Sequence, residues 1–148
     1  MQILITYIHY ISIMVLMGSL ISEYILLKSG LVKNLIKHLA IVDLLYGIAA
    51  VFVLTTGLFR WFYFGKGYDF YISNPLFHIK LTLFIVLAIL SVFPTIKILK
   101  WRKQERTGEN PTIEDKAVRR IITFIRIEFL IIIIIPLLAV LIARGSGV

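Results

Sequence analysis

Residues 120–143 read RIITFIRIEFLIIIIIPLLAVLIA, an apolar run with few charges. About 20 apolar residues in a helix are enough to cross the hydrocarbon core of a bilayer. Three similar runs lie near residues 3–27, 39–64 and 75–99. Together the four runs occupy most of the 148 residues. The sequence therefore predicts an all-α integral membrane protein, a four-helix transmembrane bundle that forms one domain over residues 1–148.

The composition supports a membrane protein and excludes several other classes. Hydrophobic residues make up 59% of the chain and charged residues only 16%, whereas soluble domains carry about 45–50% apolar residues. The absence of cysteine excludes disulfides, thiolate metal sites and covalently attached c-type haem. The net charge of +8 is concentrated in two connections. We therefore expect no nucleic-acid partner, because no soluble basic fold accompanies the charge.

The distribution of basic residues predicts the orientation of the bundle. Cytoplasmic connections carry an excess of Lys and Arg. The connection after the first run and the loop of about residues 100–119 are strongly basic, whereas the connection between the second and third runs offers only Arg60 and Lys66. We therefore expect the first and third connections in the cytoplasm and both termini outside.

Two histidines and two cations form an expected outer polar layer. His9 lies about 9 Å inside the first run and His78 about 5 Å inside the third, at 1.5 Å per residue. Ionisable residues at membrane depth usually face the bundle interior and mark a working site. The sequence predicts that His9 and His78 hold a haem or a metal ion between the first and third helices. Our interpretation is haem b with these histidines as axial ligands, because Lys80 and Arg60 would neutralise its propionates. Alternatively, each histidine is a neutral, hydrogen-bonded residue of the bundle core.

A second polar layer is expected in the inner half of the membrane. It consists of Glu23, Asp43, Arg126 and Glu128. We expect Arg126 to pair with Glu23 or Asp43 in a charge-neutralised cluster that fixes the helix register. A proton relay is the alternative function of this layer.

The connection between the second and third runs is rich in aromatic residues from Trp61 to Tyr71. Such residues are typical of an interfacial aromatic belt. The alternative is that part of this cluster lines the mouth of an apolar ligand pocket. Directly after it, Asn74 is predicted to cap the third helix, with Pro75 as its first residue.

One stretch of the third run resembles a known family. Leu76-Phe77-His78-Ile79-Lys80-Leu81 is similar to the His-x-Lys-Leu signature of HemJ-type protoporphyrinogen oxidases, small bacterial membrane proteins that bind b-type haem. His9, Gly57-Leu58 and Glu128 resemble further positions of that family. The resemblance implies haem b and oxidation of a porphyrinogen or another hydrophobic reductant. Gly18-Ser19-Leu20-Ile21-Ser22-Glu23 and Ile127-Glu128 depart from the HemJ pattern.

A resemblance over nearly the whole chain is to uncharacterised bacterial predicted membrane proteins, a domain of unknown function in a wider superfamily with HemJ and CopD-type copper-resistance proteins. It is carried by His9, Glu23, Asp43, Gly57-x-x-Arg60, Asn74-Pro75-x-Phe77-His78-x-Lys80 and Pro136-Leu137-Leu138-Ala139. It implies a multi-pass protein of the bacterial cytoplasmic (inner) membrane, whose catalytic residues are unknown. Its expected partners are the lipid bilayer, a quinone or porphyrin-type molecule, and a second copy of the chain. The rival function is a non-catalytic scaffold or a metal or ion transport component.

Overall fold

The computed structural model of the chain describes residues 1–30, 35–64 and 68–147. Its helices are α1 (Gln2–Lys28), α2 (Leu35–Phe64), α3 (Tyr68–Ser73), α4 (Pro75–Arg106) and α5 (Asp115–Ala143). These residues include no strand. The all-α fold is therefore confirmed. Two basic residues of the connections, Lys33 and Lys66, lie outside the described residues.

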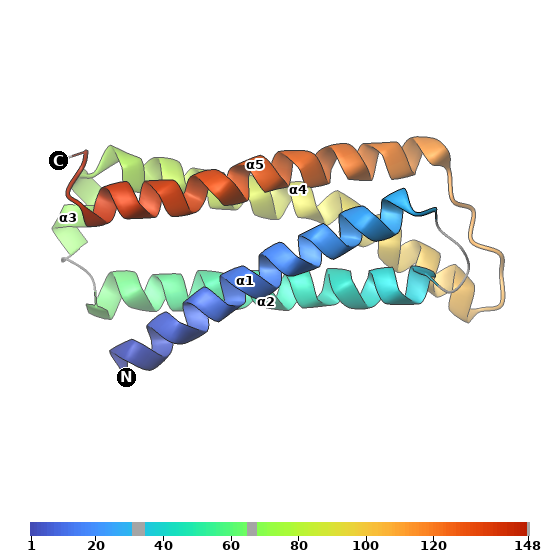
Figure 1. The fold of residues 1–148 in the computed structure, drawn as a ribbon, viewed down its shortest axis with the longest axis horizontal. Coiled ribbons are helices and arrows are strands. Elements are labelled where there is room, and N and C mark those ends of the chain that lie inside the picture. The colour runs from blue at the N-terminus through green and yellow to red at the C-terminus, as the bar shows by residue number, and fades with distance from the viewer. Residues whose placement is uncertain (31–34, 65–67, 148) are drawn as a thin grey trace.

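The four long helices of the described chain are each long and apolar enough to cross a membrane. Figure 1 shows α1 beside α2 and α4 beside α5, with both termini and the short α3 at one end of the bundle. We call this end the terminal end. Large apolar side chains such as Ile89, Ile133 and Leu137 are exposed on the bundle surface, as residues that face lipid rather than water must be. The membrane bundle predicted from the apolar runs is the observed architecture.

Each long helix turns one stripe of side chains toward the interior, at the three- and four-residue spacing of a helix face. The inner stripe of α1 consists of four buried residues: Ser12, Leu16, Ser19 and Glu23. The corresponding stripe of α5 is Ile121, Ile125, Glu128 and Ile132. That of α2 is Leu39, Asp43, Tyr46 and Ala49. Polar groups thus enter the core on three of the helices.

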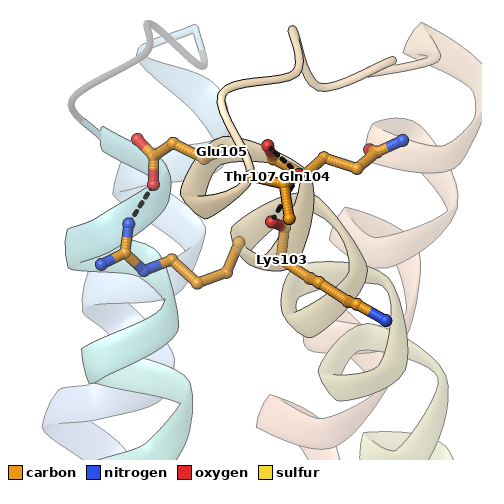
Figure 2. Close-up of polar contacts among 5 residues, drawn as sticks. Lys103, Gln104, Glu105 and Thr107 are labelled. Atoms are coloured by element: carbon orange, nitrogen blue, oxygen red, sulfur yellow. Dashed lines mark hydrogen bonds and ion pairs between the residues drawn. The ribbon is translucent and has the colours of Figure 1, made fainter.

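The basic connection is shorter than the expected loop of residues 100–119. Helix α4 continues to Arg106 and α5 begins at Asp115, because Ile98 and Trp101 are buried and hold the last turns of α4 against the bundle. Arg102 pairs with Glu105 on this end. Figure 2 shows the Thr107 hydroxyl donating to the carbonyls of Lys103 and Gln104. These hydrogen bonds provide a donor for carbonyl groups in the last turn of α4.

Asn74 joins the start of α4 to the C-terminal end of the chain. Its Oδ1 accepts a hydrogen bond from the Leu76 backbone N–H at 2.9 Å, so the predicted N-cap is confirmed. Its Nδ2 donates to the Ser146 carbonyl at 3.0 Å. The side chain is fully buried. Gly147 has a φ of +92°, and a Cβ there would lie 2.8 Å from Asn74 Oδ1, so only glycine fits beside the cap.

We expect Asn74→Ala to destabilise the bundle by about 1 kcal/mol or more, because the cap is lost and the Ser146 carbonyl loses its partner. The midpoint of thermal unfolding in detergent measures the effect. Asn110→Ala is the control, because Asn110 is exposed in the connection before α5. Equal midpoints for the two variants would contradict the role assigned to Asn74.

Candidate functional site

A cavity of about 140 Å³ lies between the four long helices. It is in the half of the bundle near the terminal end, because its walls come from the first half of α1 and α4 and the second half of α2 and α5 (Figure 1). Most of its walls are apolar, including Leu16, Val53, Phe77, Phe84, Leu87, Ile132, Ile135 and Ala139. The side chains of His9 and Lys80 also line it. We call this space the outer cavity.

Helix α2 fixes the orientation of the His9 ring. Nδ1 of His9 lies 2.8 Å from Oγ1 of Thr56. The Thr56 hydroxyl has a single hydrogen, which it donates to the Phe52 carbonyl. In the His9–Thr56 bond, Nδ1–H must therefore be the donor.

This bond determines what the other ring nitrogen can do. The Val53 carbonyl, which can only accept, also lies within reach of a His9 N–H. The neutral ring then carries its hydrogen on Nδ1, and Nε2 keeps its lone pair as an acceptor or ligand. Gly57 lets the ring approach α2 closely, because a Cβ there would already lie 3.5 Å from His9 Cε1.

Lys80 and Arg60 place positive charge beside His9. Lys80 is half-buried and, within the described residues, forms neither a hydrogen bond nor an ion pair. Arg60 is close enough to Lys80 and His9 for their charges to interact, and its guanidinium lies 5.8 Å from the centre of the Tyr10 ring. The structure thus brings His9, Lys80 and Arg60 to one layer, where no carboxylate of the described residues forms an ion pair with either cation.

His78 is not part of this layer. Its imidazole is exposed, and Nε2 donates to the Ile72 carbonyl at 2.7 Å. Lys80 follows His78 by two residues, which is a rotation of about 200° around a helix, so the two side chains point in opposite directions. The expectation that His9 and His78 face a common gap is therefore wrong. Haem b held by these two axial ligands stays a prediction, and this geometry does not support it.

The inner polar layer is assembled differently from the expectation. Glu23, Asp43 and Glu128 are buried together, with exposed fractions of 2%, 5% and 1%. Arg126 does not pair with them: its side chain is exposed and lies 3.5 Å from the Tyr24 hydroxyl. It precedes Glu128 by two residues, so it lies on the opposite face of α5. The expected neutralising ion pair is wrong.

Three hydroxyl groups that contribute to these layers were missed from the sequence. They are those of Thr56, which accepts from His9, Thr95, which donates to Asp43 at 2.8 Å, and Tyr46, which interacts with Glu128. Tyr46 follows Asp43 by three residues, so helical spacing could have placed it on the same face. Nothing in the sequence pairs Thr56 with His9 or Thr95 with Asp43 across two helices.

Comparison with known protein families gives a match over nearly the whole chain. The sequence model of a family described as "Predicted membrane protein (DUF2214)" matches residues 1–147. No curated protein and no solved structure matches the chain. The matched region includes all four long helices and both polar layers, so the expected relation to a family of predicted membrane proteins is confirmed.

The His9 tautomer is a direct prediction of this geometry. In ¹⁵N-histidine spectra of the His38→Gln, His78→Gln protein, we expect neutral His9 to carry its hydrogen on Nδ1. Thr56→Val removes the hydroxyl acceptor and leaves the Val53 carbonyl, so part of the His9 population should carry its hydrogen on Nε2, whereas Thr56→Ser should retain the wild-type signal. A wild-type ring with its hydrogen on Nε2 would contradict the assigned bond.

Proposed function

The chain belongs to the DUF2214 family of predicted membrane proteins, and from this premise we propose that it binds the ring of a lipophilic quinol-type molecule in the outer cavity. One observation carries the proposal: the Nε2 lone pair of His9 and the unpaired ammonium of Lys80 occur together on the wall of an otherwise apolar space. Small-molecule sites typically combine apolar walls with a few such polar groups.

The volume of the cavity limits the size of the ligand. An apolar cavity of about 150 Å³ holds one benzene molecule, so about 140 Å³ is enough for a single aromatic ring. A porphyrin, with four pyrrole rings, does not fit without movement of the helices. The haem b and porphyrinogen hypotheses that followed from the HemJ resemblance therefore receive less support than a quinol.

The polar groups suit a dihydroxylated ring. A quinol hydroxyl can donate to Nε2 of His9, which accepts but cannot donate in the tautomer set by Thr56. The Lys80 ammonium can donate to the second ring oxygen. With Arg60 nearby, it would stabilise that oxygen if it lost its proton. A quinone offers only acceptors, so His9 favours the reduced form of the ligand.

The tail of such a ligand has a route to the lipid. Leu54 and Pro136 line the outer cavity and are also exposed on the surface of the bundle. An alkyl or isoprenoid chain attached to the ring can therefore leave between the helices and lie against the apolar surface.

We expect tryptophan fluorescence to report the binding of a short-chain quinol, because Trp61 lines the outer cavity. The measurement uses the Trp101→Phe protein, in which Trp61 is the remaining tryptophan. Ala139→Leu fills the cavity and should weaken binding at least tenfold. Its control, Val140→Leu, changes a neighbouring side chain that faces the lipid and should bind as wild type. The dimethyl ether of the quinol cannot donate to His9 and should bind more weakly than the quinol.

Two outcomes would overturn the proposal. Equal affinity of the Ala139→Leu and Val140→Leu proteins would show that the ligand does not enter the outer cavity. A haem absorption band in protein expressed with ample haem, lost in His9→Ala, would replace the quinol with haem. Absence of binding by quinol and haem alike would favour the non-catalytic scaffold.

We further propose that the protein lies in the bacterial inner membrane with both termini outside. Both termini lie at one end of the bundle (Figure 1), and the opposite end carries the basic connection before α5, as cytoplasmic connections do. The chain has no cysteine, so single introduced cysteines can be labelled selectively. In intact cells we expect Ser146→Cys to react with an impermeant maleimide and Thr107→Cys to react only after permeabilisation. The reverse pattern would invert the orientation.

A further inference from the structure

Three carboxyl groups meet in the half of the bundle away from the outer cavity. Glu23 comes from α1, Asp43 from α2 and Glu128 from α5, and all three interact electrostatically with the Tyr46 hydroxyl. We call this group the carboxyl cluster. None of its members lines the outer cavity, so the two sites are separate and the inference below does not depend on quinol binding.

The hydrogen-bonding capacity of the cluster is only partly satisfied. Asp43 accepts from the Thr95 hydroxyl at 2.8 Å, and Glu128 interacts with Tyr46. Oε1 of Glu23 and Oε1 of Glu128 are fully buried, and neither has a hydrogen-bond partner among the residues that the structure describes. Buried polar atoms in folded proteins are nearly always partnered. Two such orphans in one cluster indicate a ligand that the protein atoms do not supply.

No cation from the described chain neutralises the cluster. The groups that face it are Glu23 from α1, Asp43 and Tyr46 from α2, the uncharged Thr95 from α4 and Glu128 from α5. None of the three carboxyls forms an ion pair within the described residues. Isolated carboxylates are strongly destabilised away from water, and adjacent ones also repel each other. The cluster must therefore bind positive charge from outside the protein.

The positive charge is a proton rather than a metal ion. Within the described residues, no three acidic or histidine side chains are close enough together to hold one metal ion. A proton needs only one carboxyl, removes its charge, and turns one oxygen into a donor for a neighbouring oxygen. It meets both requirements of the cluster, neutralisation and additional hydrogen bonds.

Asp43 connects the cluster to the surface. It lines a groove of about 360 Å³ between α2 and α4, together with Thr95, Ala40 and Gly47. Gly47 leaves space there, because a Cβ at this position would meet no atom within 4 Å. Glu23 and Glu128 do not reach this groove. Of the three carboxyls, only Asp43 lines this groove, so a proton donor that approaches along the groove meets Asp43 before either glutamate.

We infer that Glu23, Asp43 and Glu128 form a proton-binding site and that Asp43 exchanges protons between this site and the surroundings. A proton taken up by Asp43 reaches Glu128 when the Tyr46 hydroxyl gives its proton to one carboxylate and receives one from the other acid. Two protons move and the net transfer is one proton from Asp43 to Glu128; one O–H bond forms for each that breaks, and no electron is transferred.

Infrared spectroscopy of the purified protein tests the site. We expect a C=O stretching band of protonated carboxyl groups at pH 7. Glu23→Gln, Asp43→Asn and Glu128→Gln should each reduce it, whereas Asp69→Asn, at an exposed carboxyl, should leave it unchanged. Carboxylate bands alone in the wild-type protein at pH 7 would overturn the inference, as would a loss of the C=O band on addition of Na⁺ or Ca²⁺. The wild-type spectrum decides even if a variant does not fold.

Hydrogen–deuterium exchange tests the role of Asp43. The C=O band should shift in D₂O, and Gly47→Leu should slow this shift at least tenfold, because the larger side chain covers the groove. Gly18→Leu is the matched control, since a Cβ at Gly18 also meets no atom within 4 Å and Gly18 lies on another helix, outside the groove. Equal exchange rates in the two variants would exclude Asp43 as the exchanging group.

Discussion

The structure depends on the cost of keeping polar groups inside a bundle that water does not reach. In a bilayer a buried donor or acceptor has to find its partner within the protein. Asn74 meets this requirement with two hydrogen bonds that join the start of α4 to the C-terminal end. His9 meets it at Nδ1, through Thr56, and its Nε2 has no hydrogen bond within the described residues. The carboxyl cluster leaves two oxygen atoms without a partner. The candidate sites are the places where the requirement is not fully met.

The two incomplete places differ in the sign of their charge. The outer cavity has an acceptor nitrogen and cations without anions, so it favours a ligand with a hydroxyl donor and an oxygen that can carry negative charge. The carboxyl cluster has acids without cations, so it favours a proton. A quinol has two hydroxyl hydrogens that it can donate, and the carboxyl cluster has three groups that can accept a proton. Each proposal therefore places an exchangeable proton at its site. Neither proposal requires the other.

Much of the fold could be predicted from the sequence, because the length and position of apolar runs directly reflect the thickness of the bilayer. The start of α4 could also be predicted from the sequence, because Asn74 caps the helix and Pro75 begins it through local interactions. The last turns of α4 were not, because Arg102, Lys103 and Arg106 resemble a charged loop, whereas the burial of Ile98 and Trp101 extends the helix. Charge patterns locate the ends of spans less accurately than tertiary packing determines them.

The site errors have one physical origin. A shared depth in the membrane groups His78 with His9 and Arg126 with Glu23, but depth does not fix the direction in which a side chain points. The inner stripe of α4 is Phe77, Lys80, Leu81, Phe84 and Leu87, which line the outer cavity at helical spacing. His78 does not belong to it, and this could have been recognised from the sequence. Helical spacing also separates Arg126 from Glu128 on α5, because residues two apart in a helix point to opposite faces.

The hydroxyl partners could not be derived in this way, because they depend on the register between helices. Nothing in the local sequence distinguishes Thr56 or Thr95 from other helical residues. The packing of α1 against α2 brings Thr56 to His9, and the packing of α2 against α4 brings Thr95 to Asp43. Helix α1 contributes His9 to one site and Glu23 to the other, and both lie on its inward stripe. A shift of α1 along α2 would therefore break the His9–Thr56 bond and displace Glu23 from the cluster together. The register of this helix pair sets the chemistry of both sites.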